Sequence, residues 1–189
     1  MGKIISAALQ LLPDHGEARR CRRAADLHSD FLLQETDHMS AKWEQQLQRT
    51  KRYLQKFRQV NDGRPHDQHA SNYDDVVITF FQHCYHVKDW IKNDPACGSW
   101  SSVESFINAT LELAICADIC NATKHLTLKT QRSGSTPQIT GSHLQLNIGG
   151  EIPAISIKYE IDASDGPMDA FELAEKCVAA WDQFVANNI

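Results

Sequence analysis

The residues of this sequence best suited to chemistry close a long apolar segment, in the run DICNATKH at positions 118–125. On a helix, Asp118, Asn121 and His125 share one face because they are spaced three and four residues apart, and Lys124 lies beside them. An imidazole next to an amide and an ammonium can act as a general acid or base with two charge-stabilising helpers. Such a group suits a phosphodiester or acyl centre, so we take these four residues as the candidate catalytic group.

The same four residues also have a purely structural interpretation. The helix dipole favours a cation such as His125 in a last turn, and Asn121 and Asp118 could then fasten the chain that follows. A carboxylate on a core-facing stripe is costly unless it is hydrogen-bonded, paired or open to a cleft. Exposure separates the two interpretations, because a catalytic group needs a solvent-reachable cleft whereas a structural network is closed and fully paired.

A second polar group lies on the preceding predicted helix, in the run HCYHVKDW. We take His86, Lys88 and Asp89 as candidate binding residues, with Lys88 or Lys124 steadying the charge of a phosphate. The structural alternative is an ion pair between this helix and the next, which would cost desolvation but fix their packing.

The sequence favours no metal ion and no other cofactor. His83 and His86 have the spacing of a ligand pair, as do His66 and His69 in the preceding loop, but the sequence places no third ligand beside either pair. The six cysteines contain no CxxC, and most lie among apolar residues of predicted helices, as reduced thiols commonly do. A zinc site combining the loop histidines with helix cysteines has nothing to fix its geometry. We expect reduced core thiols and a cytoplasmic location.

The composition is that of one ordinary globular domain. The chain has 189 residues, 42% of them hydrophobic, and a formal net charge of −5. This charge argues against a general nucleic-acid coat or an anionic-membrane binder, although a local basic patch stays compatible with it. No apolar run approaches the roughly 20 residues needed to cross a bilayer, so we expect no membrane partner.

Residues 1–36 lack sustained periodicity and contain a cluster of four arginines, Arg19, Arg20, Arg22 and Arg23. A nucleic-acid-binding arm is one interpretation of this cluster. No aromatic stacking residue is interleaved, so a flexible, solvated extension is the preferred one. The folded domain is then expected over residues 37–189.

Periodicity within this domain predicts an α+β fold. Apolar stripes of helical period cover residues 37–60, 73–92 and 101–125, and another follows Asp165-Gly166-Pro167. Between the third and last stripes the period becomes two, which predicts half-buried strands near 126–129, 144–148 and 155–161, with a flexible connection over 132–142. We predict a bundle of about four helices with a three-stranded antiparallel β-meander inserted before the last helix.

The runs YHVKDW and DICNATKH resemble a group of small uncharacterised bacterial and phage proteins. In that group a helix bearing H-x-K-D-W precedes one that ends in D-[IL]-x-N-x-x-K-H. The resemblance covers about residues 73–128, and the helix order extends it to 39–189. The helical core of the group is similar in outline to HEPN-type bundles, named for higher eukaryote and prokaryote nucleotide-binding domains. Many of these are metal-independent ribonucleases of toxin or phage-defence systems, which implies His125 as acid or base and Asn121 as a polar helper.

The chain departs from the HEPN ribonuclease hallmark, R-x4-6-H. The third predicted helix has no such arginine, and formal matches occur only from Arg23 to His28, in the extension, and from Arg64 to His69, where Pro65 interrupts a helix. We predict a HEPN-like protein acting on RNA or nucleotide phosphate, ribonuclease-like and metal-independent if it is an enzyme. The alternative is a non-catalytic binding or regulatory module, and a homodimer through a helical face is left open.

Overall fold

The computed structural model describes residues 41–66, 69, 71–97, 100–125, 130–149, 153–163 and 166–189. The chain divides into two units, Met1–Ser40 and Ala41–Ile189, and every described residue belongs to the second. The predicted extension and the predicted strand at 126–129 lie outside the described residues. In the described part no helix is long and apolar enough to cross a membrane.

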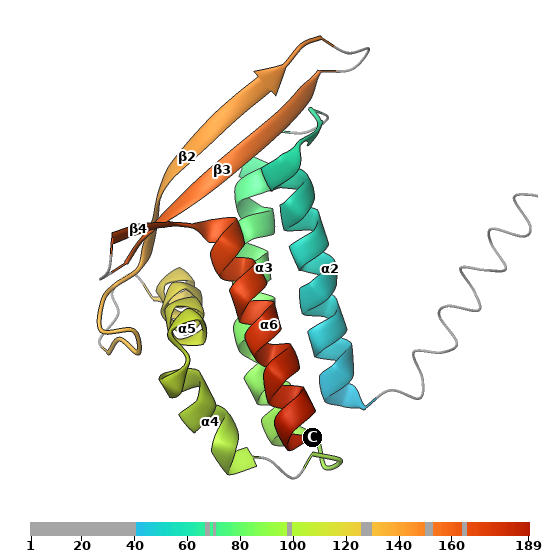
Figure 1. The fold of residues 1–189 in the computed structure, drawn as a ribbon, viewed down its shortest axis with the longest axis vertical. Helices are drawn as coiled ribbons and strands as arrows, with labels where there is room; N and C mark the ends of the chain where they lie inside the picture. The colour runs from blue at the N-terminus through green and yellow to red at the C-terminus, as the bar shows by residue number, and fades with distance from the viewer. Residues whose placement is uncertain are drawn as a thin grey trace, which may run out of the picture. The chain divides into compact units, whose positions relative to one another are not determined.

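Within the described residues, five helices form the bundle. They are α2 (Lys42–Asp62), α3 (Ser71–Asn93), α4 (Trp100–Ala109), α5 (Leu111–Lys124) and α6 (Ala170–Asn188). The long helices α2, α3 and α6 run side by side, with α4 and α5 following one another along a neighbouring edge (Figure 1). The predicted stripes are confirmed, since Phe57, Phe80 and Trp181 each bury their whole side chain. Burying such side chains stabilises the fold by about 1.5–3 kcal/mol for each one.

The third predicted helix is two helices, which corrects the sequence prediction. Thr110 leaves the helical conformation, with φ −110° and ψ 107°, so that α4 ends at Ala109 and α5 begins at Leu111. In one continuous helix Leu111 would share the buried face of Ile107 and Ala114. With the break, those two residues are buried but Leu111 is 45% exposed. A β-branched residue tolerates this extended geometry well.

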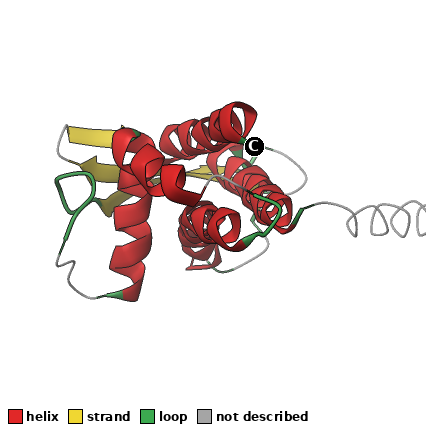
Figure 2. Ribbon diagram, turned by 90° about the horizontal axis from the view of Figure 1, so that it is seen from below, coloured by secondary structure: helices red, strands yellow, loops and turns green. Residues whose placement is uncertain are grey.

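A four-stranded antiparallel sheet caps one end of the bundle (Figures 1 and 2). Its strands are β1 (Arg64–Pro65), β2 (Gln138–Asn147), β3 (Ala154–Ala163) and β4 (Gly166–Asp169). The other three strands all pair with β3. The strands predicted near 144–148 and 155–161 are therefore confirmed as parts of β2 and β3.

Three details of the sheet region differ from the predictions. Residues 138–142, expected in a flexible connection, form the first half of β2. Leu144 and Leu146 were expected to be half-buried but are 58% and 49% exposed, because β2 is the edge strand of the sheet. Their partners on β3, Ile157 and Ile155, are buried. The last helix begins at Ala170 and not at residue 165, since Gly166–Asp169 pairs with β3 and Asp169 caps the helix by accepting two backbone N–H groups.

Candidate functional site

Asp118 lies inside the molecule on α5, with no part of the residue exposed. Its two carboxylate oxygens accept the backbone N–H of Arg132 at 2.9 and 2.8 Å, and Oδ2 also accepts the backbone N–H and the hydroxyl of Ser133 at 2.8 and 2.7 Å. Hydrogen bonds to an ionised acceptor are among the strongest in proteins, and here they compensate a buried charge. Asp118 therefore fastens the chain that follows α5 onto the helix, as the structural interpretation expects.

Glu104 on α4 lies at the centre of an ionic cluster. Its carboxylate is 3.3 Å from Nζ of Lys88, 3.2 Å from Nζ of Lys92 and 2.9 Å from Nη1 of Arg132. Burial acts to raise the pKa of Glu104, but hydrogen bonds from Lys92 and Arg132 and the charge of Lys88 outweigh it and hold the pKa at about 2. The cluster joins α3, α4 and the segment after α5.

Lys88, a predicted binding residue, is committed to this cluster. Its ammonium lies 4.5 Å from the centre of the Tyr85 ring and 3.5 Å from the carboxylate of Asp89, in addition to its contact with Glu104. Burial acts to lower the pKa of Lys88, whereas Tyr85, Asp89 and Glu104 raise it, and the net change is upward. Lys88 therefore stays charged, and its ammonium interacts with groups of the protein itself.

A surface depression of about 590 Å³ lies beside these ion pairs, lined by Glu104, Asn108, Asn121, Thr130, Gln131 and Arg132. Nη1 of Arg132 donates to Oδ1 of Asn108 at 2.8 Å across it. Asn121 is half-buried in the lining, one helical turn beyond Asp118. The depression therefore offers amide donors and acceptors together with a guanidinium already bonded to an acid.

His86 and Lys124 bring the two predicted groups together. Nζ of Lys124 lies 3.3 Å from Nε2 of His86, which joins the end of α5 to the middle of α3. Gln82 donates to the hydroxyl of Thr123 at 3.3 Å along the same seam. Burial and then the Lys124 charge lower the pKa of His86, with Asp89 acting in the opposite direction. The imidazole is therefore neutral near neutral pH and can accept a proton.

His125 occupies a more open position than the sequence suggests. It is the C-cap of α5, its backbone N–H donates to the carbonyl of Asn121 at 3.0 Å, and the residue is exposed. The dipole interaction expected at a helix end is thus available to this imidazole. Solvent reaches His125, so it meets the exposure condition for a functional residue, unlike Asp118.

The histidines of the two predicted ligand pairs contact neighbouring side chains and backbone groups. His66 Nδ1 lies 3.3 Å from the Tyr73 hydroxyl, and His69 Nδ1 accepts the backbone N–H of Ser71 at 3.3 Å. His83 contacts Gln46 and the ring of Tyr53, and its pKa is lowered by burial and then by Arg49 and other cations. In the described ranges, neither pair belongs to a group of three metal-ligating side chains.

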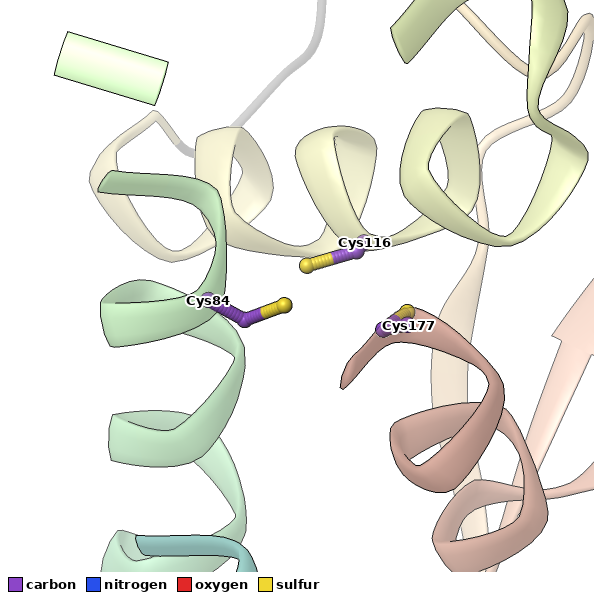
Figure 3. Close-up of side chains that lie close together, drawn as sticks. All are labelled: Cys84, Cys116 and Cys177. Carbon is purple, nitrogen blue, oxygen red and sulfur yellow. The ribbon is translucent and has the colours of Figure 1, made fainter. Parts of the chain in front are cut away.

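Three cysteines from three helices meet in the core (Figure 3). The sulfur atoms of Cys84 on α3, Cys116 on α5 and Cys177 on α6 all lie within 4.8 Å of one another, and each residue is at most 1% exposed. Burial raises the pKa of the Cys116 and Cys177 thiols. At Cys84 burial acts in the same direction, but the polar contacts of the other two thiols and of Trp181 prevail and lower its pKa.

Sequence reasoning missed the meeting of these thiols and the role of Glu104. Each cysteine was correctly expected among core residues, but which of them meet depends on how α3, α5 and α6 pack. For Glu104 a signal existed: Lys88 and Lys92 are four residues apart and therefore project from one side of α3, toward a common acidic partner.

Compared with known protein-family models, with curated proteins and with solved structures, the chain shows no match in any of the three.

Proposed function

We propose that this protein binds a phosphate group of RNA or of a nucleotide at the surface formed by His86, Asn121, Lys124 and His125, here called the His86–Lys124 surface. The observation that carries the proposal is the 3.3 Å contact between Nζ of Lys124 and Nε2 of His86. An ammonium held against an imidazole disfavours protonation of that imidazole. A bound phosphate would reverse this, because its negative charge stabilises both groups as donors.

The neighbouring depression supports a nucleotide over free phosphate. Asn121 lines it and lies one turn before Lys124 on α5, so a ligand could reach both at once. The amide of Asn121 offers a donor and an acceptor of the kind that read base edges. Asn108 Oδ1 already accepts from Arg132, and Gln131 Nε2 already donates to Thr136. Glu104 in the same lining is already neutralised by three cations, so it repels a phosphate less than a free carboxylate would.

Cleavage of RNA is the chemical extension of this proposal. The neutral imidazole of His86 could take the proton of a 2′-hydroxyl, Lys124 could stabilise charge on the phosphorus oxygens, and His125 could protonate the leaving oxygen. Such a mechanism needs no metal ion, as in the HEPN-like ribonucleases. Support for that relationship is the placement of H-x-K-D-W on α3 and of D-x-x-N-x-x-K-H on α5, where the two runs touch through His86 and Lys124.

A second candidate function is a non-catalytic binding or regulatory module. The observation that favours it is the closed network of Asp118, whose oxygens are all occupied by Arg132 and Ser133. With Asp118 and Lys88 both used internally, two of the residues expected to act on a ligand hold the fold together instead. In this case the surface binds phosphate but does not cleave it.

Titration calorimetry with adenosine 5′-monophosphate, inorganic phosphate and a short single-stranded RNA tests the proposal. Lys124→Gln should weaken binding about tenfold, as expected for loss of a charge-assisted contact of about 1.5 kcal/mol. Lys176→Gln on α6 is the matched control, an exposed lysine that should leave binding unchanged. No binding of any of the three by the native protein would overturn the proposal.

An RNA cleavage assay then separates the two candidates. Cleavage lost in His86→Gln and in His125→Asn, with RNA binding retained, would support the ribonuclease mechanism. RNA that is bound but left intact by the native protein would support the binding module. Both variants should keep nearly native stability, because the two imidazoles are solvent-reachable and not buried partners.

A further inference from the structure

Cys84, Cys116 and Cys177 have the arrangement of a ligand set and no role in the proposed phosphate chemistry. They come from α3, α5 and α6, so their meeting depends on the whole bundle and not on one local turn (Figure 3). Their thiols are not tied up in strong bonds. Cys116 donates to the Phe81 carbonyl at 3.5 Å and Cys177 donates to the Glu112 carbonyl at 3.3 Å, both weak contacts of a sulfur donor.

The spacing of the sulfur atoms is close to that of a three-coordinate site. Three sulfurs placed at about 2.3 Å around one ion lie about 4.0 Å from each other when the ion is in their plane. They lie closer together when the ion sits above that plane, as a trivalent ion with a lone pair does. In this core no two of the three sulfurs are more than 4.8 Å apart. Small side-chain rotations would therefore close the set around an ion without repacking the helices.

Coordination number excludes the usual structural zinc arrangement here. Structural zinc takes four ligands in a tetrahedron, and in the described part of the chain the group that meets the distance condition has three members. Cys120 is buried one turn further along α5, but its sulfur does not belong to the group. A soft ion that accepts three thiolates fits the set as it stands.

Charge selects among the soft ions. Three thiolates around a monovalent ion leave a net charge of −2, around a divalent ion −1, and around a trivalent ion zero. A net charge in an apolar interior costs several kcal/mol unless it is compensated. The Glu112 carboxylate acts on Cys177 and adds to the cost of any negative complex. Only the trivalent complex is neutral.

We propose that Cys84, Cys116 and Cys177 form a buried three-thiolate site for a trivalent soft ion, for which arsenite is the probe. Arsenous acid exchanges its three As–O bonds for three As–S bonds. The three hydroxide groups leave as water with the three thiol protons, one drawn from solvent where a sulfur is already ionised. Arsenic stays trivalent, so the exchange needs neither oxidant nor reductant.

Entry to this site requires the helices to open. Each of the three cysteines is at most 1% exposed, so arsenite reaches them only through transient separation of α5 or α6 from α3. Binding should consequently be slow compared with binding to an exposed trithiol peptide, and it should speed up in mild urea. Slow uptake distinguishes the core site from adventitious surface thiols.

Native mass spectrometry of the full-length chain with sodium arsenite tests the stoichiometry. The expected species gains one arsenic, loses three hydrogens and keeps no arsenic-bound oxygen. A variant with Cys21, Cys97 and Cys120 all replaced by alanine should bind as the native protein does. Single Cys84→Ala, Cys116→Ala and Cys177→Ala variants should each lose the species, and alanine is chosen because a buried cysteine behaves as a small hydrophobe.

X-ray absorption at the arsenic edge of the native protein gives a readout that needs no variant to fold. Three sulfur neighbours and no oxygen neighbour are expected. Any of three results would overturn the proposal: no arsenic bound to the native chain, an oxygen-free arsenic adduct that survives loss of a cluster cysteine, or uptake of copper(I) or zinc by these thiols with no uptake of arsenite.

Discussion

The side chain of Asp118 binds the backbone of Arg132 and not its guanidinium. Both oxygens of Asp118 accept the backbone N–H of Arg132, whereas the guanidinium of Arg132 points elsewhere, to Glu104 and to Asn108. One residue thus anchors the segment after α5 to two helices by independent means. Asp118, predicted as a member of the catalytic group, holds this segment against α5.

Asp118→Asn should lower the free energy of unfolding by about 1–3 kcal/mol, because the new amide presents N–H groups to the donors of Arg132 and Ser133. Urea unfolding followed by circular dichroism measures the change. Glu175→Gln, which breaks an exposed pair with Arg58, is the control and should cost less than about 1 kcal/mol. Equal effects of the two substitutions would mean that the Asp118 network contributes nothing special.

Acid should destabilise the protein through Glu104. Its folded pKa, about 2, lies below its ordinary value of 4.5, so its favourable contribution is complete above that ordinary value and is lost as the pH falls toward 2. Glu104→Gln should flatten this part of the curve of unfolding free energy against pH. Unchanged acid sensitivity in Glu104→Gln would assign the loss to other carboxylates.

The pKa of His86 should rise toward its ordinary value of 6.5 in Lys124→Gln, because the ammonium is one cause of its lowering. The rise should be partial, since burial, the larger cause, persists. Imidazole chemical shifts against pH in NMR measure it. Because the folded pKa is lowered, this histidine makes the native protein less stable as the pH drops below 6.5, and Lys124→Gln should lessen that loss. A His86 pKa unaffected by the substitution would contradict the contact.

Trp181→Ala should cost about 3–5 kcal/mol of unfolding free energy, the usual price of emptying a large core site. Trp181 is fully buried beside the rings of Phe106 and Phe184, and its indole N–H donates to the Cys84 carbonyl at 3.1 Å. Thermal and urea unfolding measure the loss. Trp90→Ala, at a half-buried site against Arg49, should cost clearly less.

Periodicity was sufficient to predict most elements of this fold. The stripe containing Trp181 lies on the buried face, and the alternation of Ile155, Ile157 and Tyr159 marks a strand whose one face packs on the helices. These patterns follow from local geometry, because one face of each element must be apolar to pack.

Features that depend on partners could not be predicted in the same way. The break at Thr110 depends on how α4 and α5 pack against the rest of the bundle. Strand β4 depends on the pairing of Gly166–Asp169 with β3. For the same reason, the sequence could not show which of the predicted site residues would be structural and which would be accessible. Asp118 is bonded by Arg132, fourteen residues further along the chain. His86 and Lys124 are in contact but lie on two different helices.

The placement of β1 has a consequence for the speed of folding. Arg64 pairs with Ile155, so this edge of the sheet joins two segments separated in the chain by α3, α4, α5 and β2. Contacts between residues this distant in sequence carry a large loop-closure entropy and slow the search for the native state. The helices can nucleate early from local contacts, so the pairing of β1 with β3 should come later and slow the accumulation of native molecules.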